Sequence, residues 1–239
     1  MITFDISQWR AWAPGLVTPA DWQAWAQGSR HSCSEAASPD VSFLPAMQRR
    51  RLSNLARMAF AVGWPLAEAY EALPLVFASR HGETPRTFAI LSDLADQQPL
   101  SPTQFSLSVH NAVIGLWSIL RGETSEMTAI AAAGDGLEQG LLEAAALLAE
   151  GAPAVLLIVC EELPPAVYDA WVDDVPFAYA LGLLVTPGQQ WQLSPGPAAT
   201  QSLPAALPHA LNWLQATLNG VNCFTHTWKR RSWTWQRQP

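Results

Sequence analysis

The pattern of apolar and polar positions between residues 121 and 162 predicts a strand, a tight turn, a helix and a second strand. Met127–Ala133 is a short apolar run, and Gly134-Asp135-Gly136 interrupts it. The helix is indicated by apolar residues at helical spacing, at Leu137, Leu141, Ala145 and Leu148. The continuous apolar run Ala154–Cys160 is typical of a buried strand.

A strand that enters a helix through such an elbow is where many α/β enzymes place a nucleophile, because the helix N-terminus stabilises a developing anion. Here the elbow holds glycine and aspartate. It therefore has the architecture of an active site without an obvious nucleophile.

The rest of the pattern predicts further strands and helices in one domain over residues 1–239, since there is no internal repeat or linker. Further strands are expected at residues 2–12, 73–79, 177–186, 190–193 and 223–235. Further helices are expected to begin near residues 18, 45, 84, 108 and 203. The helix from residue 45 should reach residue 70 and kink or split between Gly63 and Pro65. Residues 100–105 are expected to form a loop.

Composition favours a chain that covers apolar surface with a protein partner. Charged residues make up only 14% of the chain, below the roughly 25% of an ordinary domain, and there are 12 tryptophans. The net charge of −7 argues against nucleic-acid binding. Three cysteines without framework spacing, and no signal peptide, predict a cytoplasmic protein. The longest apolar run is too short for a membrane span.

The glycines of the elbow also allow an interpretation as a dinucleotide-binding loop. Gly134-x-Gly136-x-x-x-Gly140 follows a strand and opens a helix, and Glu161 or Glu162 ends the next strand, where a carboxylate would bind a ribose. Against it, Asp135 would face a pyrophosphate and the glycine spacing is a variant. A dinucleotide-binding oxidoreductase therefore stays an alternative.

Hydrolase and metal chemistry have weaker support. The elbow lacks the Gly-x-Ser-x-Gly pattern, and the closeness of Ser106, Ser108 and His110 in sequence does not make a triad. The candidate metal pairs, His31-x-Cys33 and Cys223-x-x-His226, lack a second pair at finger spacing. We therefore expect neither a metal nor a cofactor.

Three motifs resemble the N-terminal half of a β-ketoacyl synthase, and more closely the short ketosynthase-like subunits called chain length factors in aryl polyene biosynthesis. They are VFASRHGE at 76–83, LSPTQFSLSVHNA at 100–112 and the unit 128–162. The arginine triplet at 49–51 also fits that group. The resemblance covers nearly the whole chain. It implies a thiolase-like α/β fold, with a mixed five-stranded sheet sandwiched by helices and an extra C-terminal helix and strand.

The resemblance also implies that this subunit has no catalytic residue. Ketosynthases carry a T-A-x-x-x-A-C-A run at the elbow, with the nucleophilic cysteine at the helix start. Laid over Thr128–Asp135, that cysteine position is Gly134. The family's two further catalytic residues lie in the C-terminal half of the fold, and no HGTGT-like stretch is present. Without a thiol, no acyl-enzyme forms.

The implied role is a non-catalytic chain length factor, paired with a full-length, cysteine-bearing ketosynthase and supplied by acyl carrier protein. The resemblance places dimer contacts at Thr128, Ala129, Ile130, Ala131 and Asn111. Residues that would reach the partner's acyl tunnel and limit chain growth are Gln104, Phe105, Leu107, His110 and Met127. Two basic triplets would steer the acidic carrier protein: Arg49, Arg50, Arg51 and Lys229, Arg230, Arg231. A purely structural partner subunit is the other interpretation.

Overall fold

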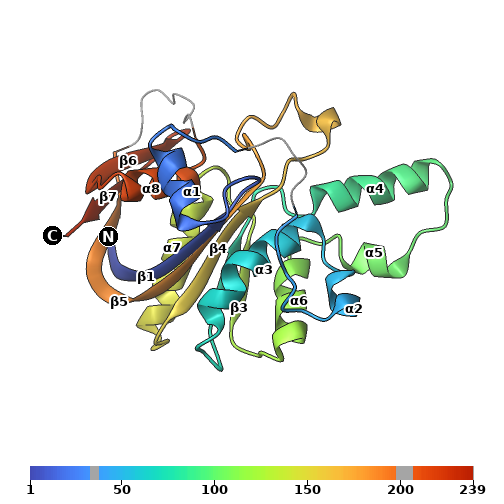
Figure 1. Cartoon of the computed structure of the whole chain (residues 1–239), viewed down its shortest axis with the longest axis horizontal. Helices are drawn as coiled ribbons and strands as arrows, with labels where there is room; N and C mark the ends of the chain where they lie inside the picture. The colour runs from blue at the N-terminus through green and yellow to red at the C-terminus, as the bar shows by residue number, and fades with distance from the viewer. Residues whose placement is uncertain (33–37, 198–206, 239) are drawn as a thin grey trace.

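The computed structural model describes residues 1–32, 38–197 and 207–238 (Figure 1). Its strands are β1 (Ile2–Trp12), β2 (Leu75–Ala78), β3 (Met127–Ile130), β4 (Val155–Glu161), β5 (Tyr179–Pro195), β6 (Cys223–Trp228) and β7 (Arg231–Arg237). Its helices are α1 (Pro19–Ala26), α2 (Ala46–Arg49), α3 (Asn54–Ala67), α4 (Thr84–Ala95), α5 (Pro102–Ser106), α6 (Ala112–Arg121), α7 (Gly136–Ala149) and α8 (His209–Leu218), with a 3₁₀ turn at Ala166–Tyr168. None of these helices is both long and apolar enough to cross a bilayer.

The described strands form one mixed sheet of seven strands, rather than the predicted five with one extra C-terminal strand. The order is β3-β2-β4-β5-β7-β6, and β1 also pairs with β5. β2 runs parallel to β3 and β4, whereas the other pairings are antiparallel. β3 has only one strand neighbour and forms an edge of the sheet. The carboxyl ends of β2, β3 and β4 therefore meet at one end of the sheet, which is where the elbow lies.

Side chains alternate along the central strands, so the sheet carries a core on each face. Val155, Leu157 and Val159 face a cluster that includes α1, α7, α8 and the C-terminal strands. Leu156 and Ile158 face a second cluster built mainly on α3 and α6. The second half of the chain, together with β1 and α1, thus supplies the cover for the face on which α7 lies.

The predicted long helix from residue 45 is broken near Ser53, not at Gly63 or Pro65. Ser53 Oγ accepts a hydrogen bond from the Ala56 amide at 3.0 Å, which starts a new helix, α3. Pro65 lies inside α3, close to its end. Gly63 packs under Trp117 and Ile158, so α3 continues through both predicted breakers.

Three other predicted elements differ in the structure. Residues 177–186 and 190–193 belong to one long strand, β5, which pairs with β4 in its first part and with β7 in its last. Residues 223–235 form a hairpin, β6–β7, that turns at Lys229 with φ +54°. Residues 102–106 form helix α5 instead of a loop, and α6 begins at Ala112 rather than near Ser108.

Candidate functional site

The elbow between β3 and α7 is covered by the C-terminal hairpin. A Cβ built on Gly134 would lie 2.3 Å from Cε3 of Trp228 and 2.5 Å from two further atoms of the same ring. Carbon atoms in contact are normally about 3.5–4.0 Å apart. The indole of Trp228 therefore occupies the space that any side chain at position 134 would need.

Asp135, the next residue of the elbow, is held by β7. Its carboxylate accepts two hydrogen bonds from the Arg231 guanidinium, both at 2.6 Å, and one from Trp233 Nε1 at 3.1 Å. Burial opposes ionisation of Asp135, but the bonds from Arg231, Gln139 and Trp233 outweigh it and hold the pKa below its ordinary value. Asp135 thus ties the start of α7 to the hairpin.

One turn further along α7, the carboxylate of Glu138 is fully buried among donors from α8 and the hairpin. It accepts hydrogen bonds from His226 Nδ1 at 2.6 Å, His209 Nδ1 at 2.9 Å and Trp235 Nε1 at 3.0 Å. The two imidazole rings lie close together, with centroids 4.4 Å apart and their planes tilted by 32°. This arrangement joins α7, α8 and both strands of the hairpin through one carboxylate.

The protons of this cluster are distributed unequally. Burial alone would raise the pKa of Glu138, yet the bonds from His209 and His226 lower it far below its ordinary value, so the carboxylate is ionised. Burial lowers the pKa of His209, but Glu138 outweighs it and the net shift is upward. Burial lowers the pKa of His226, and the neighbouring His209 adds to this. We assign one charged imidazole, His209, and one neutral imidazole, His226.

These three side chains also form a group able to hold a metal ion. The short Nδ1–oxygen distances and the third bond from Trp235 instead describe a hydrogen-bonded cluster in which each carboxylate oxygen already has a donor.

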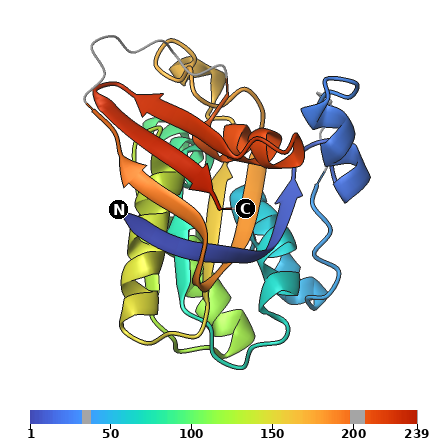
Figure 2. The ribbon, with the colours of Figure 1, turned by 90° about the vertical axis from the view of Figure 1, so that its left-hand side faces the viewer.

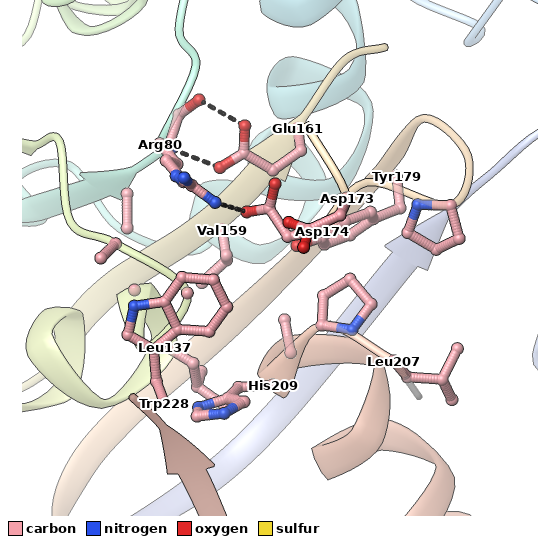
Figure 3. Close-up of a pocket in the computed structure, with 18 residues that line it drawn as sticks. Arg80, Leu137, Val159, Glu161, Asp173, Asp174, Tyr179, Leu207, His209 and Trp228 are labelled. Atoms are coloured by element: carbon pink, nitrogen blue, oxygen red, sulfur yellow. Dashed lines mark hydrogen bonds and ion pairs between the residues drawn. The ribbon is translucent and has the colours of Figure 1, made fainter. Parts of the chain in front are cut away.

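A cavity of about 90 Å³ lies beside the elbow, between the ends of β2 and β4 and the start of α8 (Figure 3). On one side, Glu161 accepts hydrogen bonds from the Arg80 and His81 amides and from Ser79 Oγ. The Arg80 guanidinium pairs with Asp174 at 2.6 Å. Burial raises the pKa of Glu161 to about 7 despite these bonds. Trp228 and His209 close the opposite side, as Figure 3 shows.

The sequence matches the family model described as "Beta-ketoacyl synthase, N-terminal domain" over residues 22–236. The chain belongs to this family. Among curated proteins, no significant match is found.

Solved structures agree with this assignment to the ketosynthase family. One chain of the ketosynthase ApeO in complex with its chain length factor ApeC, from Xenorhabdus doucetiae, is 31% identical; 99% of this chain and 100% of that chain are covered, with a TM-score of 0.89. The ishigamide ketosynthase/chain length factor is 14% identical over 90% of this chain and 82% of that one, with a TM-score of 0.64. A β-ketoacyl synthase from Burkholderia phymatum STM815 is 12% identical over 93% and 71%, with a TM-score of 0.59. The predicted thiolase-like fold and the resemblance to chain length factors are thereby confirmed.

The five residues predicted to reach the partner's acyl tunnel do not lie close together in the structure. His110 Nε2 lies 2.8 Å from the carbonyl oxygen of Ser79, which lines the elbow cavity. Gln104 and Phe105 lie on α5, which projects from the body together with α4 (Figure 1). Leu107 and Met127 are half-buried against the core on the α3 and α6 face. Met127 pairs with Leu75 at the start of β2, so it and His110 lie at opposite ends of that strand.

The predicted contact residues of the dimer surround the sheet edge. Thr128, Ala129 and Ile130 belong to β3, Ala131 follows it and is exposed, and Asn111 is the N-cap of α6. The basic triplets differ from each other: Arg49–Arg51 lie in and after α2, with Arg50 and Arg51 exposed, whereas Arg231 pairs with Asp135. Lys229 and Arg230 are exposed at the turn of the hairpin.

The structure does not support the alternative interpretations as a dinucleotide-binding loop, a hydrolase triad or a metal site. The indole of Trp228 covers Gly134, and Gly140 packs on Leu157, so these glycines serve packing and leave a pyrophosphate no approach at Gly134. His110 contacts the Ser79 carbonyl, and Ser108 Oγ bonds to the Phe105 carbonyl rather than to His110. His226 of the Cys223-x-x-His226 pair contacts Glu138. Cys33, of the other pair, lies outside the described residues.

Sequence reasoning missed the residues that close the elbow: Glu138, His209, Trp228, Trp233 and Trp235. One signal was available, because Glu138 is a charged residue directly beside the apolar stripe of α7, where a buried carboxylate needs partners. The two histidines of the aromatic C-terminal region were candidates for those partners.

Proposed function

We propose that this chain is a non-catalytic chain length factor. It pairs with a cysteine-bearing β-ketoacyl synthase in the cytoplasm and helps to shape the acyl tunnel of that partner during aryl polyene biosynthesis. Acyl groups reach the pair on acyl carrier protein. The observation that carries the proposal is the glycine at the elbow, over which the ring of Trp228 lies, in a chain of the ketosynthase family.

The non-catalytic part rests on the chemistry of acyl transfer, which needs a nucleophile at the elbow. Position 134 has no side chain, and the space beside it is filled by an indole. Cys160, the nearest cysteine in sequence, is fully buried at the end of β4, where burial raises the pKa of its thiol. A buried thiol of this kind is not a nucleophile.

The edge strand β3 supports the pairing. The amides of Leu75 and Ser79 donate to the Glu126 and Ile130 carbonyls, so the alternation of a parallel ladder points the amide and carbonyl of Ala129 away from β2, toward the open edge. Exposed backbone groups on a sheet edge are available to pair with another strand. In ketosynthase dimers the strands before the two elbows meet at the two-fold axis, and β3 is the corresponding strand here.

Large apolar side chains on the segment between β2 and β3 also favour a partner. Six residues on α4, α5, α6 and the loops between them are between 42% and 75% exposed: Leu91, Leu94, Leu100, Phe105, Val109 and Ile119. α4 has no buried residue at all, and Figure 1 shows it extending from the body with α5. Such a surface is typical of one that another protein covers.

Co-expression with a cysteine-bearing β-ketoacyl synthase from the same organism tests the proposal. We expect a heterodimer that survives size-exclusion chromatography, and condensation activity that needs the ketosynthase cysteine. A chain that stays a monodisperse monomer in the presence of that ketosynthase would contradict the pairing. Calorimetric binding of a nicotinamide cofactor to the chain would instead revive the dinucleotide alternative.

A purely structural partner is the second candidate. Its support is the position of Gln104 and Phe105 on the projecting α5, where they can contribute contact area without reaching a tunnel. Product length in the reconstituted pair separates the two functions, because only the tunnel-shaping role predicts that a change at Phe105 alters it.

A further inference from the structure

Any side chain at position 134 would clash with Trp228, and the reason is side-chain volume alone. Gly134 is not one of the glycines with a positive φ, so any residue could adopt its backbone conformation. The obstacle is the six-membered ring of Trp228, which contributes all three of the atoms closest to a Cβ built on Gly134. Glycine is therefore required here by a neighbour, not by the turn.

The ring of Trp228 cannot move aside cheaply, because the chain on both sides of it is anchored. Two residues before it, His226 bonds to Glu138 at 2.6 Å, and three residues after it, Arg231 bonds to Asp135 at 2.6 Å. The ring also contacts two cations: the Arg80 guanidinium is 5.3 Å from the ring centroid and the Lys229 ammonium is 5.8 Å from it.

Behind the ring, the elbow keeps open space. The cavity of about 90 Å³ is lined by both Gly134 and Trp228, so removing the indole would join its volume to space that already exists. Asp135 beside it is neutralised by Arg231, and it would not place an unpaired negative charge next to a thiol at position 134.

We propose that Trp228 is a plug that keeps the elbow closed, so that this chain excludes small electrophiles both by the glycine and by the ring. A thiol at position 134 fits and reacts only when the ring is removed. The site that then opens accepts small uncharged electrophiles, of the alkylating or thioester class. This inference concerns the chain itself and does not depend on its partner.

Iodoacetamide is the probe. In the reaction the introduced thiol loses its proton to solvent, and the thiolate sulfur displaces iodide from the carbon, forming one C–S bond as the C–I bond breaks. Gly134→Cys, Trp228→Ala and the double variant are compared with the unmodified chain. Peptide mass spectrometry follows labelling at position 134, which separates it from the native cysteines. Thermal unfolding is measured for each protein.

We expect Gly134→Cys alone to lower the melting temperature by roughly 4–10 °C, as overpacking does in a chain of this size. In the Trp228→Ala background the same change should cost little, and labelling at position 134 should be roughly tenfold faster than in the single variant. Gly115→Cys is the matched control, since a Cβ on Gly115 meets nothing within 4 Å. Trp171→Ala controls for loss of a tryptophan, because that residue is 71% exposed.

Two results would overturn the plug. One is a Gly134→Cys chain that melts like the unmodified protein and is labelled as fast as the double variant. The other is a double variant no more stable than expected from adding the two single effects, which includes a double variant that fails to fold. A failure of heterodimer formation would leave both measurements intact, so the two proposals fail separately.

Discussion

His226 Nδ1 on β6 donates a hydrogen bond to Oε1 of Glu138 on α7, across 2.6 Å and 88 residues of sequence, with both side chains hidden from solvent. His209 on α8 binds the other carboxylate oxygen at 2.9 Å. A buried carboxylate is costly without partners, so each of the three elements depends on the other two. This contact fixes the hairpin on α7 and, with it, the position of Trp228.

Glu138→Gln should destabilise the chain by about 3–5 kcal/mol, the usual cost of breaking a buried charged group. The amide would present N–H groups where one imidazole N–H now donates, and it would leave His209 charged without its counter-ion. Urea denaturation measures the change. Glu150→Gln, on an exposed position at the end of the same helix, should have little effect. Equal stability of the two variants would contradict this role of Glu138.

The free energy of unfolding should fall between about pH 5 and pH 8 in part because of Glu161. Burial raises the pKa of Glu161 from 4.5 to about 7. Because the pKa of Glu161 is higher in the folded chain, its protonation stabilises the fold fully at pH values below 4.5. This contribution, at most about 3 kcal/mol, is lost as pH rises through 7.

Glu161→Gln removes that contribution and should flatten the slope of unfolding free energy against pH. His209, whose pKa is also raised, contributes a slope of the same sign in both proteins, so the difference between them isolates Glu161. Urea denaturation at several pH values provides the measurement. Parallel curves for the two proteins would argue against an ionising Glu161.

Arg231→Ala should lower the free energy of unfolding by about 1–2 kcal/mol, because it leaves Asp135 buried with weaker donors. Partial exposure of the arginine limits this loss. Arg230→Ala, one residue earlier at the exposed turn, serves as the matched control and should be close to neutral. Thermal unfolding compares them. If both variants unfold alike, the ion pair does not secure the hairpin.

Ala129→Pro should weaken heterodimer formation without unfolding the chain. The proline removes the amide that points to the open edge of β3, and leaves the bonds of β3 to β2 in place. Size-exclusion chromatography with the ketosynthase and thermal unfolding of the chain alone are the two readouts. Retention of full pairing by this variant would exclude β3 as the paired edge.

Phe105→Ala should change the chain length of the product made by the reconstituted pair, because the 65% exposed ring on α5 is available to contact the partner. Val221→Ala, two residues before β6, is the control for loss of exposed apolar surface, and Figure 1 shows β6 on the opposite side of the molecule from α5. Mass spectrometry of the products gives the answer. Unchanged products with intact pairing would favour the purely structural role.

The amino-acid sequence by itself determined the strands, the helices and the elbow wherever their side chains repeat at a local spacing. The continuous apolar run that forms β4 and the helical stripe of α7 are examples, because both can be recognised from neighbouring residues without knowledge of distant contacts. The motifs around residues 76–83 and 100–112 likewise identified the family, since they lie within short stretches of sequence.

Only the tertiary structure decided what closes the elbow. Trp228 lies 94 positions after Gly134 in the sequence, and the bonds from Glu138 to His209 and His226 span 71 and 88 residues. Figure 2, with the hairpin in red, shows the C-terminal strands beside β5 at the end of the molecule where α7 begins. No local period encodes such partners, because which side chain meets which depends on how the strands order themselves in the sheet. The empty elbow is visible in the sequence, but the ring that fills it is visible only once the chain has folded.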